Sequence, residues 1–109
     1  MTKSKDIREF FEAMPKAFQK DKAAKINATY QFVLGGEGGG TWYVDVRGGA
    51  LEVGEGKKDK PDVTLRASAA DYVAIAEGRM NPVLAMATGK FKIEGNLGLA
   101  MKLQSIFKR

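Results

Sequence analysis

The sequence of 109 residues contains no cysteine and no histidine. Without cysteine, the chain has no disulfide framework, no thiol nucleophile and no thiolate metal site. Without histidine, it lacks the commonest general base, the commonest metal ligand and the usual pH switch. The serines Ser4, Ser68 and Ser105 therefore have no imidazole to activate them, and the carboxylates are scattered and often near basic residues, as Glu94 is to Lys92. We expect no catalytic residues, no metal and no cofactor.

Long uninterrupted hydrophobic runs are also absent. The first residues, MTKSKDIREFFEAM, do not form a secretory signal, and no stretch is long enough to span a bilayer. The last residues, Phe107-Lys108-Arg109, are not the peroxisomal address. We therefore expect a cytoplasmic protein with one domain over residues 1–109, a length that can bury a core without disulfides. Its net charge of +5 favours anionic partners in general: nucleic acid, a membrane surface or an acidic headgroup.

Several stretches show the alternation of half-buried strands. Residues 26–34 place apolar side chains on one face and polar ones on the other, which predicts a strand with one buried and one wet face: Ile26, Ala28, Tyr30, Phe32 and Leu34 against Asn27, Thr29 and Gln31. Further strands are predicted over residues 41–47, from residue 51, over 63–67 and around 91–93. Gly48 and Gly49 predict a tight hairpin turn, because adjacent glycines adopt positive φ at no steric cost.

Other segments show helical spacing. The first carries the apolar stripe Ile7, Phe10, Phe11, Met14 and Phe18. Ser4 is its predicted N-cap, and Pro15 predicts a kink or a restart. Further helices are predicted after Ser68, after Asn81 with Pro82 in the first helical position, and over residues 97–107. Because the alternating strands need one face covered, this order of elements predicts a two-layer α+β sandwich.

Two motifs suggest binding of a phosphate or of an anionic surface, and we interpret both as loops. The run GGEGGG at residues 35–40 is followed by a predicted strand, whereas a phosphate loop leads into a helix, so a flexible hairpin loop is favoured. The run Lys57-Lys58-Asp59-Lys60 is predicted to be a solvated loop. Nucleic-acid modules interleave exposed aromatic and basic residues, and Tyr43 with Arg47 is the one such hint on the predicted outer face. We expect no nucleic-acid partner.

The last predicted helix carries more apolar surface than a surface helix needs. One sector of its helical wheel holds Leu99, Ala100, Leu103, Ile106 and Phe107, and can pack on the sheet as ordinary core. An adjoining sector holds Leu97, Met101 and Gln104, a mixture that suits an adaptable apolar pocket with a polar handle. From the residues alone, a pocket wall and a simply buried helix are equally good interpretations.

Three sequence blocks together resemble the sterol carrier protein 2 family: GEGGGTWYVDV with the following Gly48-Gly49, PDVTLRASAADYVAIAEGRMNPVLAMATGKFKIEGN, and LGLAMKLQSIF. The resemblance covers roughly residues 7–107. It implies a five-stranded mixed, mainly antiparallel sheet, covered on one face by helices, with an apolar tunnel between the layers. It also implies noncatalytic binding and intracellular transfer of fatty acids, fatty acyl-CoA, phospholipids or sterols.

Carried over by position, the resemblance predicts a set of tunnel-lining residues: Phe32, Trp42, Leu65, Val73, Met80, Leu84, Phe91, Ile93, Leu97, Met101, Gln104 and Phe107. Lys22 and Lys25 are predicted headgroup contacts on charge alone. The missing peroxisomal tail and fused enzyme domains favour a free-standing microbial form with fatty acyl ligands. We expect a monomer or weak dimer, with transient contact to anionic membranes allowed by the charge. The alternative is a protein-interaction or dimerisation module that uses the same apolar groove.

Overall fold

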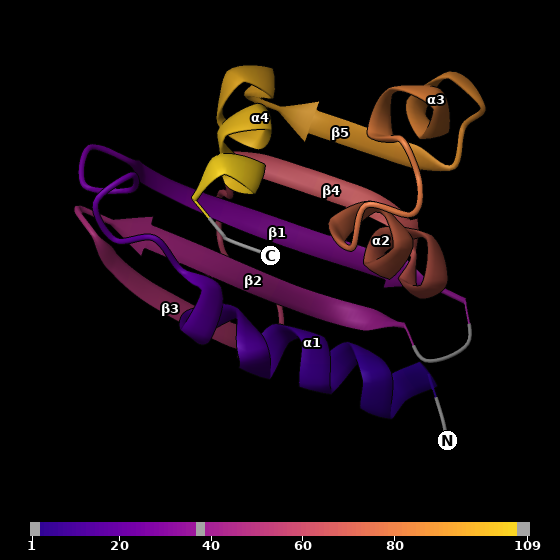
Figure 1. Cartoon of the computed structure of the whole chain (residues 1–109), viewed down its shortest axis with the longest axis horizontal. Coiled ribbons are helices and arrows are strands. Elements are labelled where there is room, and N and C mark those ends of the chain that lie inside the picture. The colour runs from indigo at the N-terminus through magenta and orange to yellow at the C-terminus, as the bar shows by residue number, and fades with distance from the viewer. Residues whose placement is uncertain (1–2, 37–38, 107–109) are drawn as a thin grey trace.

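One mixed sheet forms the back of the molecule, with strand order β3-β2-β1-β4-β5 (Figure 1). The computed structural model describes residues 3–36 and 39–106. Its strands are β1 (Asn27–Gly35), β2 (Gly40–Arg47), β3 (Ala50–Glu55), β4 (Val63–Ser68) and β5 (Phe91–Gly95). The pairs β1–β2, β2–β3 and β4–β5 are antiparallel and the pair β1–β4 is parallel. The predicted mixed, mainly antiparallel sheet is confirmed.

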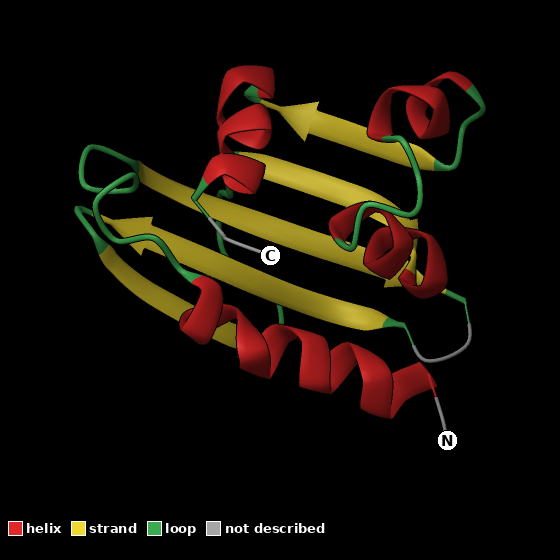
Figure 2. Cartoon of the chain, in the orientation of Figure 1, coloured by secondary structure: helices red, strands yellow, loops and turns green. Residues whose placement is uncertain are grey.

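The helices are α1 (Lys3–Ala17), α2 (Ala69–Ala76), α3 (Pro82–Ala87) and α4 (Leu97–Ser105). They lie on the viewer's side of the sheet in Figure 2, where they are drawn in red. Helix α1 packs on β3 and α2, α2 packs on β4 and β1, α3 packs on β5, and α4 packs on β4 and β5. The predicted α+β arrangement, with helices covering one face, is confirmed. None of these helices combines the length and apolar character needed to cross a bilayer.

Local sequence signals account for several of the element boundaries. The Ser68 hydroxyl accepts a hydrogen bond from the Asp71 amide at 3.0 Å and caps α2. The Asn81 side chain accepts one from the Val83 amide at 2.8 Å and caps α3, with Pro82 in its first turn. Gly48 and Gly49 have φ of 56° and 91°, as the predicted hairpin turn between β2 and β3 requires. These predictions are confirmed.

The beginning and end of α1 differ from the prediction. The helix begins at Lys3, so Ser4 lies inside it and the predicted N-cap is wrong. It continues through Pro15 to Ala17, so the predicted restart is wrong as well. A proline costs a helix the hydrogen bond to the carbonyl four residues earlier. Because Pro15 lies in the last turn, only that bond is lost there, and the buried Phe11 and Met14 hold the turn against the core.

The predicted wet face of β1 is also wrong. Asn27 is exposed, but Thr29 and Gln31 are only 6% and 4% exposed. The segment after β3 folds back over this face. The side-chain amide of Gln31 donates to the Trp42 carbonyl at 2.7 Å and to the Gly56 carbonyl at 3.0 Å. Its side-chain oxygen accepts from the backbone N–H of Lys58 at 2.6 Å. Because β1 is the central strand, cover from this loop buries both of its faces.

Aromatic side chains fill the space between α1 and the sheet. The Phe11 ring stacks on Trp42 with centroids 4.8 Å apart and meets Phe32 edge-on at 5.2 Å. All three side chains are buried. At the other end of the core, the Tyr30 hydroxyl donates to the Leu99 carbonyl at 2.8 Å and attaches α4 to the central strand. Much of the aromatic part of the core therefore lies against β1 and β2.

Candidate functional site

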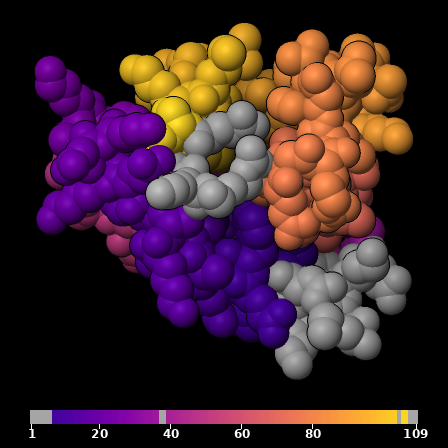
Figure 3. Space-filling view, viewed as in Figure 1, coloured from indigo at the N-terminus to yellow at the C-terminus, as the bar shows by residue number. Residues whose placement is uncertain are grey.

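An apolar pocket of about 340 Å³ lies between the helices and the β4–β5 side of the sheet. Leu65 on β4 and Phe91 and Ile93 on β5 form part of its wall from the sheet side. Figure 3 shows the orange atoms of α2 and α3 and the yellow atoms of α4 on either side of this region. The helical lining residues are Phe10, Met14, Tyr72, Ile75, Ala76, Pro82, Val83, Met86, Leu97, Ala100, Met101 and Leu103. A volume of this size lies in the range of small-molecule sites.

The local sequence explains why the layers stay apart here. Helix α3 has only six residues, packs on β5, and is held by its Asn81 cap. Helix α4 is held by its own cap, in which the Asn96 side chain accepts from the Leu99 amide at 3.0 Å, and by the Tyr30 contact. Two helices fixed at separate places on the edge of the sheet leave an apolar gap that neither of them fills.

Tyr72 gives the pocket wall its polar group. The other lining residues that the structure describes have apolar side chains. Tyr72 is 6% exposed, and no residue of the described chain offers its hydroxyl a hydrogen bond. Burial raises the pKa of this hydroxyl above its usual value, so it stays protonated and can donate. Its ring is fixed by edge-on contacts with Phe32 and Phe10, at 5.2 and 5.7 Å between centroids.

Five of the sequence-predicted lining residues contribute to this pocket: Leu65, Phe91, Ile93, Leu97 and Met101. Leu97 and Met101 belong to the extra apolar sector of the last helix. They are 52% and 71% exposed, so this sector forms the mouth of the pocket rather than its interior.

The structure places the other predicted residues elsewhere. Phe32 and Trp42 are buried against the Phe11 ring of α1 and do not line the pocket. Leu84 is 64% exposed on the outer side of α3, and Met80 packs against the core between α2 and α3. Phe107 and the side chain of Gln104 lie outside the part of the chain that the structure describes.

The predicted headgroup residues Lys22 and Lys25 are exposed in the turns between α1 and β1 and do not line the pocket. This segment is tied to the end of α4, because the Gln19 amide donates to the Ile106 carbonyl at 2.7 Å. The sequence suggested these lysines by charge alone, and charge gives no position relative to the pocket mouth.

A second, more polar hollow of about 560 Å³ lies between α1 and α2. Val73, another sequence-predicted lining residue, contributes to this groove together with Ala13 and Ala17. Glu77 and Arg79 also line it and form an ion pair at 2.7 Å. Phe10 and Met14 line both hollows and therefore form the partition between them. The apolar pocket is the better ligand site, because its wall carries no charged side chain among the described residues.

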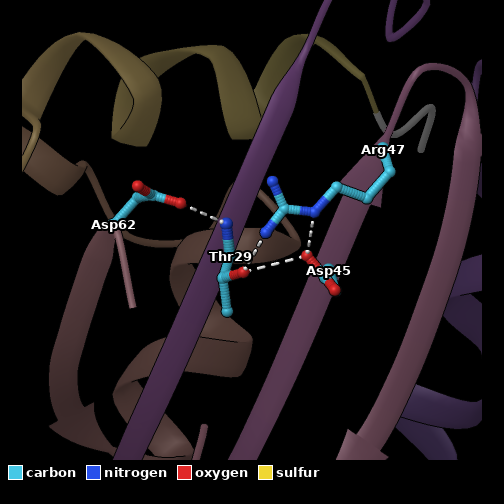
Figure 4. Close-up of polar contacts among 4 residues, drawn as sticks. All are labelled: Thr29, Asp45, Arg47 and Asp62. Carbon is cyan, nitrogen blue, oxygen red and sulfur yellow. Dashed lines mark hydrogen bonds and ion pairs between the residues drawn. The ribbon is translucent and has the colours of Figure 1, made fainter. Parts of the chain in front are cut away.

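A polar cluster lies on the face of the sheet away from the helices (Figure 4). The Thr29 hydroxyl donates to Asp45 and accepts from Arg47, both at 2.9 Å. Arg47 and Asp45 form an ion pair at 3.1 Å, and Asp62 accepts from the Thr29 amide at 2.8 Å. Each group is thus paired with its neighbours, and the cluster explains how β1 can bury Thr29.

Metal chemistry finds no support in the described part of the chain, where no group of three or more acidic side chains could hold an ion. Glu94 forms an ion pair with Arg66 at 3.0 Å, and Asp45 is held by Thr29 and Arg47. The pocket wall offers hydrophobic contact and one hydroxyl. This chemistry suits binding of an apolar molecule.

The family model of the SCP-2 sterol transfer family matches residues 7–108. The chain belongs to this family. It is similar to human sterol carrier protein 2, with 40% identity over 105 residues, 94% of this chain and 18% of that protein. It is also similar to hydroxysteroid dehydrogenase-like protein 2 of Xenopus tropicalis, with 36% identity over 94% of this chain and 25% of that protein. The chain thus spans about a quarter or less of the length of these relatives.

Solved structures of family members share the fold. The palmitated SCP2L2 of Aedes aegypti has a TM-score of 0.70 and 28% identity, over 92% of this chain and 89% of that one. Family membership and this likeness identify the chain as a lipid-binding domain, and they do not favour the interaction-module alternative.

Several pocket residues were missed from the sequence. Phe10 and Met14 were interpreted as core, because a stripe at helical spacing does not show where the core gives way to a pocket. Tyr72 left a usable signal: it is a hydroxyl-bearing residue within the otherwise apolar run YVAIA at residues 72–76. Val83 and Met86 were missed because α3 presents these two residues, and not Leu84, to the pocket.

Proposed function

We propose that the pocket holds the hydrocarbon part of a fatty acyl lipid, and that the domain carries this lipid without changing it. The observation that carries the proposal is the pocket wall, which is apolar over the described residues except for the Tyr72 hydroxyl. The palmitated relative of the same fold supports an acyl chain over a sterol as the ligand.

Hydrophobic burial is sufficient for useful affinity. About a dozen buried CH₂ groups would supply roughly 10 kcal/mol at ~0.8 kcal/mol each. Much of this is offset by the lost freedom of the ligand. Micromolar binding, about −8 kcal/mol, is the result we expect. An affinity in this range also allows a carrier to release its cargo.

The charged end of the ligand is expected at the surface. No charged side chain lines the apolar pocket among the described residues, and an unpaired ion in such a wall would be costly. Lys22 and Lys25 remain proposed contacts for the phosphates of an acyl-CoA. If they have this role, changing both to Glu will weaken acyl-CoA binding more than binding of an uncharged lipid, whereas equal losses would contradict it.

The binding site can be tested by filling it. Ala100 lines the pocket and is 7% exposed, so Ala100→Trp places an indole in the space that the ligand needs. We expect this variant to lose at least about tenfold in affinity for a fluorescent fatty acid. Ala70→Trp makes the same change at an exposed position of α2 outside the pocket wall, and should bind like the wild type.

A second variant protects the test against misfolding. Met101→Glu places a charge at the 71%-exposed pocket mouth, where the fold can tolerate it, and should also weaken uptake. Circular dichroism checks that both variants are folded. Wild-type affinity in folded Ala100→Trp and Met101→Glu would refute this pocket as the site. Steady release of free fatty acid from palmitoyl-CoA, in proportion to protein concentration, would refute the carrier.

A further inference from the structure

Phe10 and Met14 separate the apolar pocket from the hollow between α1 and α2, which we call the α1–α2 groove. The two residues lie one helical turn apart on the same face of α1. The ring of Phe10 is held edge-on against Phe11 and Tyr72, at 5.3 and 5.7 Å between centroids. Met14 has an unbranched side chain with three rotatable bonds, so it adapts its shape more easily. Met14 is therefore the movable half of the partition.

The α1–α2 groove continues beyond the partition with small apolar side chains. Ala17 and Val73 are half-buried, and they line the groove but not the pocket. The groove has a volume of about 560 Å³, which leaves room for further methylene groups of a ligand. A rotation of the Met14 side chain would join the pocket and the groove into one channel through the helical layer.

The apolar pocket alone is short for a long acyl chain. A methylene group takes up about as much space as a water molecule, whose share of the liquid is ~30 Å³. The pocket of about 340 Å³ therefore holds roughly a dozen methylene groups. A longer chain must leave the rest of its carbon atoms in water or move part of the wall.

The charges of the groove decide which end of a fatty acid faces it. Glu9, Glu77 and Arg79 are the charged residues of its described wall, and Arg79 is paired with Glu77 at 2.7 Å. Glu9 forms no ion pair within the described residues, so the groove has an excess of negative charge that repels a carboxylate. Figure 1 shows α1 on the opposite edge of the helical layer from α4, which forms part of the pocket mouth. With the carboxylate at that mouth, the methyl end points toward Met14.

We infer that Met14 is the movable end of the pocket and determines the length of the acyl chain that the domain accepts. A short chain ends at Met14. The methyl end of a longer chain displaces the Met14 side chain and lies in the groove against Ala17 and Val73. This inference rests on the proposed function and adds to it a ligand class, the long-chain fatty acids.

The test compares the affinities for short-chain laurate and long-chain eicosenoate, measured by displacement of a fluorescent fatty acid. Ala17→Trp places an indole in the groove and leaves the pocket wall unchanged. We expect it to weaken eicosenoate binding at least about tenfold and laurate binding less than about twofold. Met14→Ala removes the movable half of the partition and should raise the ratio of eicosenoate to laurate affinity at least about fivefold. Ala70→Trp, exposed on α2 and outside both walls, is the matched control and should keep the wild-type ratio.

Laurate binding also shows that each variant is folded. In the wild type, the amide NMR signals of Ala17 and Val73 should shift with eicosenoate and stay in place with laurate. The inference is overturned if folded Ala17→Trp or folded Met14→Ala keeps the wild-type ratio, or if Ala70→Trp changes the ratio as much as Ala17→Trp does. It is also overturned if the wild type binds laurate but not eicosenoate. Binding of neither fatty acid to the wild type would refute the proposed function itself.

Discussion

The Tyr72 hydroxyl has an unusual position at the scale of a single residue. Buried hydroxyls in proteins generally have a hydrogen-bond partner. Tyr72 is 6% exposed and finds none among the described residues, yet no side-chain oxygen in that part of the chain is both fully buried and unpaired. The hydroxyl is therefore not fully enclosed, and the residue that carries it lines the pocket. It is available to a neutral oxygen atom of a bound lipid.

Replacement of Tyr72 by phenylalanine should change ligand selectivity rather than general affinity. The ring contacts with Phe32 and Phe10 remain, so the fold and the apolar wall are kept. We expect Tyr72→Phe to bind stearate like the wild type. A hydroxystearate whose hydroxyl reaches Tyr72 should lose about 1 kcal/mol, or about fivefold in affinity. Displacement of a fluorescent fatty acid measures both constants, and equal losses for the two ligands would show that the hydroxyl has no role.

Strand β1 shows, at the scale of an element, what the sequence could and could not predict. Its alternation correctly indicated the face that packs under the helices, with Tyr30 and Phe32 fully buried. It could not show that Thr29 and Gln31 are covered on the other face. Gln31 is covered by residues 56–58, which are distant in sequence and reach it through backbone groups, and backbone groups leave no composition signal. Thr29 is covered instead by Asp45, Arg47 and Asp62.

The same limit applies to the candidate site. From periodicity alone, the extra apolar sector of the last helix, with Leu97 and Met101, suited a pocket wall and a buried helix equally well, and both residues line the pocket described here. Periodicity could not show which side of the sheet lies under the pocket. Trp42 was therefore included by position, although β2 places it beneath α1.

The hydrogen bonds that join the Gln31 side chain of β1 to β2 and to the loop after β3 should contribute measurably to stability. Gln31→Met keeps the approximate shape but removes three hydrogen bonds, leaving the Lys58 amide and the Gly56 carbonyl without this partner. We expect the free energy of unfolding to fall by about 2 kcal/mol, measured by urea denaturation. Gln19→Met, which loses one contact of 3.4 Å to the Ser105 carbonyl, is the matched control and should cost less than half as much. Equal losses of unfolding free energy in the two variants would mean that the three hydrogen bonds of Gln31 contribute no more than the single contact of Gln19.

At the scale of the whole molecule, the two sides of the sheet differ in how they are packed. The β3–β2–β1 side is held by stacked aromatic rings under α1 and by polar contacts on its outer face. The β4–β5 side carries the pocket and the exposed apolar side chains of α3 and α4. This division lets the pocket side remain open without unfolding the rest of the chain.

The buried tyrosines at the junction of these two sides should make the whole fold sensitive to alkaline pH. Burial, and secondarily the negative charge of Asp62, raises the pKa of Tyr30 from 10 to about 12. Burial raises the pKa of Tyr72 as well. The folded chain therefore holds these protons more tightly than the unfolded chain does. Their contribution to stability is fully present below pH 10 and is lost as the pH rises through the folded pKa values.

We therefore expect the free energy of unfolding to decrease between about pH 10 and pH 12, by at most about 1.4 kcal/mol per pH unit for each tyrosine. Tyr30→Phe removes the hydrogen bond to the Leu99 carbonyl and should be less stable near neutral pH. Its stability should nevertheless fall less steeply in the alkaline range, because one of the two buried tyrosines that titrate there is gone. Urea denaturation at a series of pH values gives both curves. If the two curves were parallel up to pH 12, Tyr30 would not be a source of the alkaline sensitivity.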